Sequence, residues 1–280
     1  MIIWLASYPK SGNTWMRAII SALIHSKNGV FNFNLLKQIK QFPEKKYFKD
    51  LIKDFSDFNE IKENWILAQE KINLNNEIKF LKTHHGKYTV EKNNFTNDKN
   101  TLATIYIVRD PRTLVSSISN HYSISNNDAA NFLLDPSMIG NSKSFEDKQD
   151  GMLTLLGKWN DHYRSWTRNK NNLLIIRYED LISNPKTELI KLIVFLKKYI
   201  KFQSNEEKNQ NILNTTSFKN LKEMEKKGLF LENVINKDTK NNVDFFHLGP
   251  KNNWQDILDK KIIDKIEKNF SLDMKEIGYI

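Results

Sequence analysis

The chain has 280 residues, 39% of them hydrophobic and 27% charged, so it can form a packed core and is not a disordered protein. It contains no cysteine, which excludes a disulfide scaffold, a thiolate metal site and a cysteine nucleophile. No apolar run approaches the ~20 residues that a membrane-spanning helix needs. The first residues, MIIWLASYPKSG, lack the basic start and the longer apolar stretch of a secretory signal. We therefore expect a soluble, cytoplasmic protein.

The net charge is +10, from 43 basic and 33 acidic residues. Such a balance favours anionic ligands or nucleic acid but says nothing about the fold. Lysine makes up most of the basic residues, which favours the interpretation of a solvated lysine surface. A nucleic-acid-binding protein would bind polynucleotides with a steep salt dependence, but the chain shows no recognition motif for one. We therefore expect no nucleic-acid partner.

Short apolar runs alternate with helical patterns along the chain. Buried strands are predicted at Ile2–Ala6 and Leu173–Ile176, a short strand at Ile78–Leu81 and a central strand at Leu102–Val108. Helices are predicted at Asn13–Ser26, 34–70, 144–169, Pro185–Ile200 and 254–269, with a loop over 228–250. Asp110 and Pro111 are suited to begin another helix. The alternation predicts a single α/β, P-loop-like domain over 1–280, with a central parallel sheet and helices on both faces.

The first motif is the loop Ser7–Trp15, between the first predicted strand and the first predicted helix. A loop in this position directs backbone N–H groups and the positive end of the helix dipole at an anion. Lys10 adds a full charge, and Asn13 and Thr14 add donors. The motif is not a Walker A sequence, because its lysine precedes its only glycine. The pattern predicts a phosphate site, with an ordinary strand–loop–helix turn as the alternative.

The segment Tyr8–Trp15 closely resembles the 5′-phosphosulfate loop of sulfotransferases that use 3′-phosphoadenosine 5′-phosphosulfate (PAPS). The second signature of that family is a strand that ends in arginine, with a serine eight residues later, and here Ile105–Val108 precedes Arg109 and Ser117. The resemblance implies that Arg109 and Ser117 hold the 3′-phosphate. It further implies a PAPS site that includes Lys10, Ser11, Gly12, Asn13, Thr14 and Trp15. Arg109 also ends a strand at the sheet edge where α/β proteins bind ligands.

Between these two motifs lies the segment Lys82-Thr83-His84-His85. Sulfuryl transfer needs a base for the acceptor proton, and histidine has a suitable pKa. The resemblance implies that His84 is the catalytic base and that Lys82, together with Lys10, stabilises charge on the departing phosphate. His85 should point the other way if the strand continues, and it is the second candidate for the base.

Further matches extend the resemblance along most of the chain. Tyr178, in Tyr178-Glu179-Asp180, is the counterpart of a tyrosine that approaches the adenine, and Trp15 would stack on the same ring. A tyrosine packed at a strand end and a core tryptophan are the alternatives. The segment that lies near the nucleotide in the family corresponds here to Thr216, Ser217 and Phe218.

The segment Phe245–Trp254 departs from the family pattern. Many relatives carry Arg-Lys-Gly here, which grips the 3′-phosphate, whereas this chain has His247 and Leu248 before Gly249. We expect Gly249 to keep its place in the donor site. We expect Lys251, together with Arg112, to supply part of the missing positive charge.

The resemblance implies a PAPS-dependent sulfotransferase that moves a sulfuryl group to a hydroxyl or amine and releases adenosine 3′,5′-bisphosphate without a metal. Two alternatives stay open: a P-loop-like kinase, which would need Mg²⁺, and a family member that binds nucleotide without turnover. The acceptor would be a small molecule, a lipid or a glycan, and the sequence fixes neither its identity nor the oligomeric state. The aromatic residues of 42–58 are interpreted as packing residues rather than as an acceptor pocket.

Overall fold

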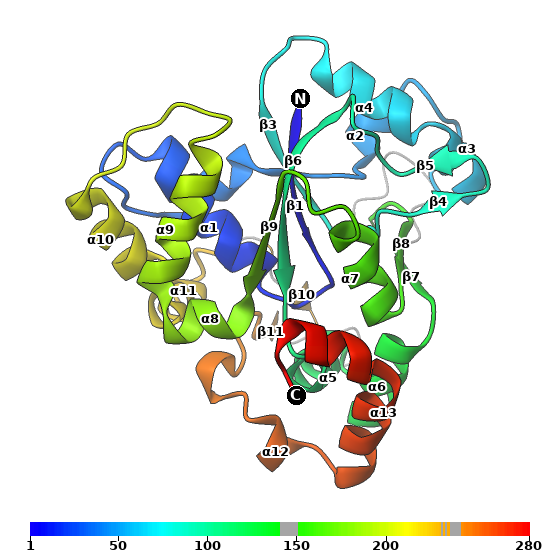
Figure 1. Ribbon diagram of the computed structural model, residues 1–280, viewed down its shortest axis with the longest axis vertical. Helices are drawn as coiled ribbons and strands as arrows, with labels where there is room; N and C mark the ends of the chain where they lie inside the picture. The colour runs from blue at the N-terminus through cyan, green and yellow to red at the C-terminus, as the bar shows by residue number, and fades with distance from the viewer. Residues whose placement is uncertain (141–150, 231, 233, 236–241) are drawn as a thin grey trace. The chain divides into compact units, whose positions relative to one another are not determined.

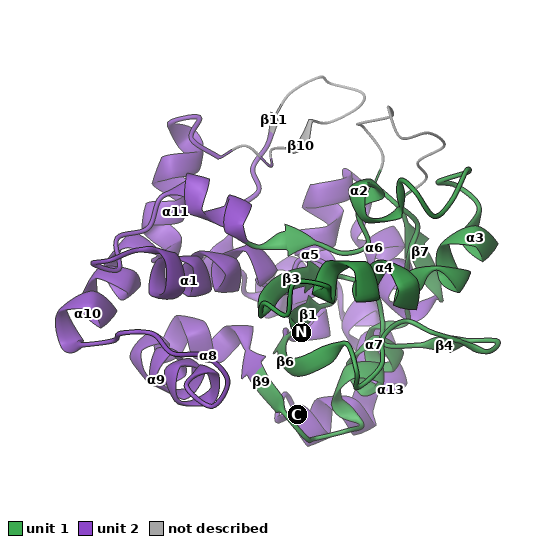
Figure 2. Ribbon diagram, turned by 90° about the horizontal axis from the view of Figure 1, so that it is seen from above, with its two compact units in different colours: residues 1–8, 39–107, 136–175 green, residues 9–38, 108–135, 176–280 purple. Residues whose placement is uncertain are grey.

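The computed structural model describes residues 1–140, 151–230, 232, 234–235 and 242–280. The chain divides into two compact units (Figure 2). Unit 1 comprises residues 1–8, 39–107 and 136–175, and unit 2 comprises residues 9–38, 108–135 and 176–280. The chain passes between the units repeatedly, so neither unit is one continuous stretch of sequence. One domain over 1–280 stays a prediction.

A parallel five-stranded sheet is the centre of the fold (Figure 1). Its strands, in the order β2-β3-β1-β6-β9, are β2 (Lys40–Gln41), β3 (Lys79–Thr83), β1 (Ile2–Ser7), β6 (Thr101–Val108) and β9 (Leu173–Arg177). In the parallel register, Trp4 lies opposite Leu81 on β3 and Thr104 on β6. Every residue of β1 is buried, as expected of an apolar strand with neighbours on both sides. The prediction of an α/β fold with a parallel sheet flanked by helices is confirmed.

Several of the predicted elements differ in detail from the structure. Of the four residues predicted as a buried strand at Leu173–Ile176, only Ile176 is buried, because β9 ends the strand order and has a neighbour on one side alone. The helix predicted over 144–169 begins only at Trp159, as α7 (Trp159–Thr167), because β8 (Thr154–Gly157) pairs antiparallel with β7 (Ser137–Ile139). Residues 144–150 of that prediction lie outside the described residues.

The core of unit 1 is aromatic. The Trp4 ring packs against Phe42, Phe95 and Trp166, with ring centroids 5.6 to 6.0 Å apart. Phe42, Phe48 and Phe55 are buried, which supports the interpretation that the aromatic residues of 42–58 pack in the core. The helix-like stretch 34–70 is broken into short pieces: η1 (Phe33–Gln38, in unit 2), β2, α2 (Lys45–Phe48), α3 (Phe58–Glu63) and α4 (Trp65–Asn73). A hairpin of β4 (Thr89–Val90) and β5 (Asn93–Asn94) belongs to the same unit.

Unit 2 is mainly helical. Its helices are α1 (Asn13–His25), α5 (Pro111–Tyr122), α6 (Asn126–Leu134), α8 (Tyr178–Ser183), α9 (Pro185–Leu196), α10 (Glu206–Thr215), α11 (Phe218–Lys226), η2 (Gly249–Lys251), α12 (Trp254–Ile257) and α13 (Lys260–Ile277). Two short strands, β10 (Val234–Ile235) and β11 (Asn242–Val243), pair antiparallel. The Asp110 carboxylate accepts a hydrogen bond from the Arg112 N–H and Pro111 begins the helix, so the predicted start of α5 is confirmed. The helix predicted at 254–269 is two helices, because Leu258 is extended.

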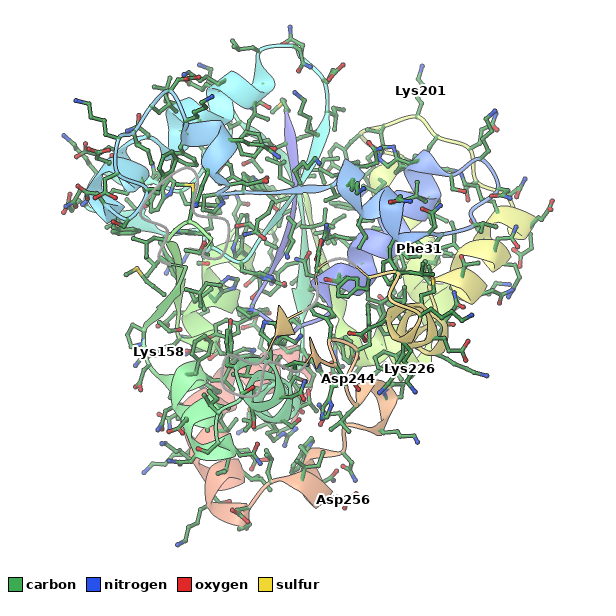
Figure 3. All side chains as sticks on the ribbon, turned by 180° about the vertical axis from the view of Figure 1, so that it is seen from behind. Phe31, Lys158, Lys201, Lys226, Asp244 and Asp256 are labelled. Atoms are coloured by element: carbon green, nitrogen blue, oxygen red, sulfur yellow. The ribbon has the colours of Figure 1, made fainter. Side chains whose placement is uncertain are left out.

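Charged side chains cover the outside of the chain, and Lys158, Lys201 and Asp256 extend into solvent (Figure 3). This agrees with the interpretation of a solvated lysine surface. Within the described residues, we find no helix with both the length and the apolar character needed to cross a bilayer.

Candidate functional site

The loop before α1 turns sharply. Lys10 and Gly12 both have positive φ, 66° and 102°. A Cβ at Gly12 would lie 2.7 Å from the Tyr178 ring, so only glycine lets this ring approach the loop. The Ser11 hydroxyl is fully buried and has no hydrogen-bond partner among the described residues. A buried donor left open at the start of a helix suits an anionic ligand.

The Lys10 side chain is held by aromatic residues of unit 2. Its Nζ lies 3.8 Å from the centroid of the Phe245 ring and 3.4 Å from Nδ1 of His121, on α5. A cation over a ring face is attracted by the ring electrons. The Lys10 ammonium is therefore positioned by contacts that the sequence pattern did not indicate.

Arg109 ties three of the predicted motifs together. Its Nη1 donates to the Lys10 carbonyl oxygen (2.9 Å), and its Nε donates to Oγ1 of Thr113 (3.0 Å). Its guanidinium carbon lies 4.1 Å from the centroid of the Tyr178 ring. The guanidinium has five N–H donors, and these two hydrogen bonds to described residues use two of them. The other N–H groups can donate to a ligand.

A pocket of about 190 Å³ lies beside Arg109 in unit 2. Of the residues that the sequence placed in the donor site, Arg109, Tyr178 and Gly249 line it; the other lining residues are Thr113, Glu179, Ile182, Pro250 and Asn252. A Cβ at Gly249, where φ is 54°, would overlap the Phe218 ring. Glycine therefore allows the turn η2 to pack against α11.

Three aromatic residues from separate motifs meet in unit 2. The Trp15 ring is buried and makes edge contacts with Tyr178 and Phe218, at centroid distances of 5.7 and 6.5 Å. The neighbouring hydroxyls serve the helices locally, because Thr216 donates to the Ile212 carbonyl and Ser217 caps α11. Their contact with a nucleotide stays a prediction.

The contact of Ser117 and Lys251 with a 3′-phosphate stays a prediction. Ser117 lies on α5 and accepts a hydrogen bond from Nδ2 of Asn252 (3.3 Å), a residue that the sequence did not single out. Lys251 is exposed at the end of η2. The one feature of the sequence that could have indicated Asn252 is its position next to Lys251.

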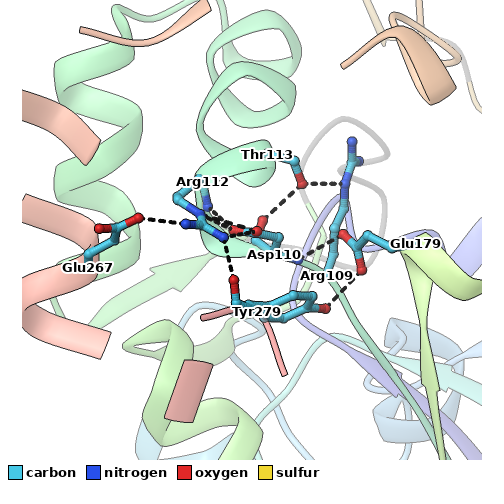
Figure 4. A network of polar contacts seen from close by, with 7 residues as sticks. All are labelled: Arg109, Asp110, Arg112, Thr113, Glu179, Glu267 and Tyr279. Carbon is cyan, nitrogen blue, oxygen red and sulfur yellow. Dashed lines mark hydrogen bonds and ion pairs between the residues drawn. The ribbon is translucent and has the colours of Figure 1, made fainter. Parts of the chain in front are cut away.

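Arg112 does not fit the role expected of it. Its guanidinium pairs with Asp110 (2.6 Å) and Glu267 (2.5 Å) and donates to the Tyr279 carbonyl (Figure 4). It also lies 4.0 Å from the centroid of the Trp254 ring. Two carboxylates already compensate its charge, so Arg112 stabilises unit 2 rather than a phosphate.

The same network reaches the pocket through Glu179 (Figure 4). One carboxylate oxygen accepts from the Asp110 N–H (3.1 Å) and the other from the Tyr279 hydroxyl (2.9 Å). Burial raises the pKa of Glu179, although these hydrogen bonds oppose that effect. These two hydrogen bonds fix the position of the Glu179 carboxylate, which lines the pocket.

His84, in unit 1, follows directly after β3. Its Nδ1 lies 2.8 Å from the Ser7 carbonyl oxygen and 3.3 Å from the Ser7 hydroxyl. A carbonyl oxygen only accepts, so Nδ1 carries the hydrogen and Nε2 of the neutral ring keeps a lone pair. This is the tautomer that a general base needs. Lys82, also predicted to be catalytic, lies half-buried on β3.

A buried histidine that the sequence did not single out supports the His84 backbone. His162, on α7, has Nε2 3.0 Å from the His84 carbonyl oxygen and Nδ1 2.8 Å from the Tyr106 hydroxyl. Burial lowers the pKa of His162 to about 4, so the ring is neutral. Its Nε2 donates to His84, and its Nδ1 accepts from Tyr106. The only feature of the sequence that could have indicated His162 is its position among the aromatic residues of a helix.

His85 has a different environment from His84. It is fully buried, its ring is stacked on Phe95 with centroids 4.1 Å apart, and its Nδ1 bonds to the Gly86 carbonyl (2.6 Å). Burial lowers its pKa to about 3. His85 is a core residue, which leaves His84 as the better placed base. In the part of the chain that the structure describes, no group of three or more acidic or histidine side chains is suited to a metal.

Comparison with known proteins gives one consistent result. A family model described as "Sulfotransferase domain" matches residues 2–278. The sulfotransferase 1B1 of Canis lupus familiaris is 26% identical over 232 residues, covering 79% of this chain and 66% of that protein. The amine sulfotransferase of Oryctolagus cuniculus is 22% identical, covering 98% and 81%. The chain spans about two thirds of the length of the first curated relatives that it matches.

Solved structures show the same fold. The mouse sulfotransferase SULT7A1, complexed with PAP, has a TM-score of 0.61 at 19% identity, covering 98% of this chain and 84% of that one. Retinol dehydratase in a complex with retinol and PAP also has a TM-score of 0.61, at 18% identity, covering 98% and 81%. At these identities the likeness establishes the α/β architecture.

Gly12→Ala is predicted to destabilise the chain more than Gly228→Ala. Both glycines have positive φ, but a Cβ at Gly12 meets the Tyr178 ring, whereas a Cβ at Gly228 meets no described atom within 4 Å. We expect a loss of about 1 kcal/mol at Gly228 from the backbone strain alone and a further ~1–2 kcal/mol at Gly12. Urea unfolding measures both. Equal losses would contradict the close contact with Tyr178.

The free energy of unfolding is predicted to fall in acid because His85 is buried in its neutral form. Its folded-state pKa of about 3 lies below the ordinary value of 6.5, so the unfolded chain takes up a proton that the folded chain refuses. Below pH 6.5 this costs ~1.4 kcal/mol per pH unit, or about 2 kcal/mol at pH 5. Urea unfolding at pH 7.5 and 5.0 should show a smaller loss for His85→Gln than for the wild type. A His85→Gln loss equal to that of the wild type would contradict the burial argument.

Proposed function

The chain belongs to the sulfotransferase domain family, and on that premise we propose that it transfers the sulfuryl group of PAPS to a hydroxyl or an amine and releases adenosine 3′,5′-bisphosphate (PAP). One observation carries the donor assignment. Arg109 bonds to Lys10, lies over Tyr178 and faces a pocket, so three motifs that resemble donor-binding segments meet at one guanidinium. The PAP in the two structural neighbours agrees with this donor.

In the proposed donor site, Arg109 and Ser117 bind the 3′-phosphate, with Lys251 as an exposed charge at the end of η2. The loop before α1 binds the 5′-phosphosulfate, because the buried Ser11 hydroxyl and the helix N–H groups there can donate to an anion. The adenine would lie against the aromatic residues Trp15, Tyr178 and Phe218. Thr216, Ser217 and Gly249 would complete the nucleotide site.

The proposed reaction is an in-line displacement at sulfur. The acceptor oxygen or nitrogen forms the new bond to sulfur, and the bond between sulfur and the bridging phosphate oxygen breaks with its electron pair going to PAP. The acceptor proton is proposed to go to Nε2 of His84, because Nδ1 already donates to the Ser7 carbonyl. Lys10 and Lys82 are proposed to stabilise the charge that develops on the departing phosphate. This mechanism uses protein cations in place of a metal.

The acceptor is proposed to be a small molecule, a lipid or a glycan. One relative is an amine sulfotransferase of Oryctolagus cuniculus, and one structural neighbour contains retinol, an alcohol, which supports an amine or a hydroxyl as the acceptor group. We propose a cytoplasmic location, as the sequence analysis expects.

His84→Ala is predicted to lower sulfuryl transfer by about 10²-fold or more, while PAP binds as in the wild type, because the change removes the proton acceptor alone. The assay uses ³⁵S-labelled PAPS with 4-nitrophenol, a steroid alcohol and an aliphatic amine as acceptors. His25→Ala, at an exposed histidine, is the matched control.

Transfer retained in His84→Ala would place the base elsewhere. A wild type that binds PAP yet transfers to none of the acceptors, nor releases labelled sulfate to water, would contradict the proposed activity and favour a family member without turnover.

A further inference from the structure

We propose that Asn252 is a positioning residue for the 3′-phosphate: it keeps the Ser117 hydroxyl free to donate to the ligand and fastens the turn η2 to α5. This inference rests on the proposed function. It addresses how a chain that has His247 and Leu248 in place of Arg-Lys holds the 3′-phosphate.

The Asn252 side chain makes three hydrogen bonds to one face of α5. Its Nδ2 donates to the Thr113 carbonyl oxygen (2.9 Å) and to Oγ of Ser117 (3.3 Å), and its Oδ1 accepts from the Ser116 hydroxyl (2.9 Å). Asn252 also lines the pocket beside Arg109. A single amide therefore fixes the turn against the helix that carries Ser117.

These bonds decide what the Ser117 hydroxyl can do. A serine within a helix commonly donates to the carbonyl four residues earlier, here that of Thr113. The Thr113 carbonyl already accepts from Nδ2 of Asn252, and Ser117 Oγ itself accepts from the same amide. Among the described residues, the Ser117 O–H has no acceptor. Its hydrogen is therefore available to a phosphate oxygen.

The arrangement also involves Arg109. Thr113, whose carbonyl binds Asn252, accepts a hydrogen bond from Nε of Arg109 through its side chain. Thr113 thus connects the Arg109 guanidinium to the part of α5 that carries the Ser117 hydroxyl. Recognition of the 3′-phosphate then depends on one arginine and on neutral donors that Asn252 orients, instead of on several cations.

The test compares Asn252→Ala with Asn253→Ala by calorimetric titration with PAP and with ADP, which lacks the 3′-phosphate. Asn253 is a matched control, because it is the adjacent asparagine and its exposed side chain bonds to Asp256 (2.6 Å). Asn252→Ala should weaken PAP binding about tenfold and ADP binding less than about threefold, since a lost charge-assisted hydrogen bond affects the 3′-phosphate alone. Asn253→Ala should change neither.

The ADP affinity shows whether each variant has kept its fold. Equal losses for PAP and ADP in Asn252→Ala would overturn the positioning role and leave a structural one. Full retention of the PAP preference would also overturn it while leaving the proposed function intact. A wild type with no preference for PAP over ADP would instead contradict the proposed donor.

A double variant tests whether Asn252 acts through Ser117. If it does, Asn252→Ala should reduce PAP affinity much less in a Ser117→Ala background than in the wild type, because the hydroxyl that it orients is already absent. Independent, multiplying effects of the two changes would contradict the proposed route.

Discussion

The fixed position of the Arg109 guanidinium is the constraint on which the candidate donor site depends. A buried cation is costly unless its donors are partnered, and here the partners are the Lys10 carbonyl, the Thr113 hydroxyl and the Tyr178 ring. Each partner comes from a different part of the sequence, so satisfying one arginine brings the loop before α1, the start of α5 and the start of α8 together. The close approach of Tyr178 in turn requires glycine at position 12. The pocket beside Arg109 follows from these contacts.

The neighbouring histidines show how environment separates two identical side chains. His84 donates from Nδ1 to a backbone carbonyl and is half-buried, which leaves Nε2 as an acceptor. His85 is stacked on Phe95 in the core, and burial lowers its pKa to about 3. The two are adjacent in the chain, yet one is suited to proton transfer and the other to packing. The neutral His162 holds the His84 carbonyl in place, which links the candidate base to the core of unit 1.

Features written in a short stretch of sequence could be predicted, and features that depend on distant residues could not. The apolar strands, the start of α5 at Asp110 and the loop before α1 are local patterns, and their predictions agree with the structure. The strand β8 depends on pairing with β7, and its position inside a helical pattern was missed for that reason. Arg112 was expected to bind a phosphate because the sequence alone does not show that Asp110 and the distant Glu267 both pair with its guanidinium. Asn252 and His162 were missed because an amide or a histidine has no specific pattern until its partners are known.

The most direct test of the central claim is calorimetric titration of the wild type and Arg109→Lys with PAP and ADP, without added metal. Lysine keeps the charge but loses the planar fork that bonds to Lys10 and Thr113 and faces the pocket. The account predicts that the wild type binds PAP at least ~10-fold more tightly than ADP and that Arg109→Lys loses most of this preference. Equal affinities of the wild type for the two nucleotides, or an unchanged preference in Arg109→Lys, would contradict it.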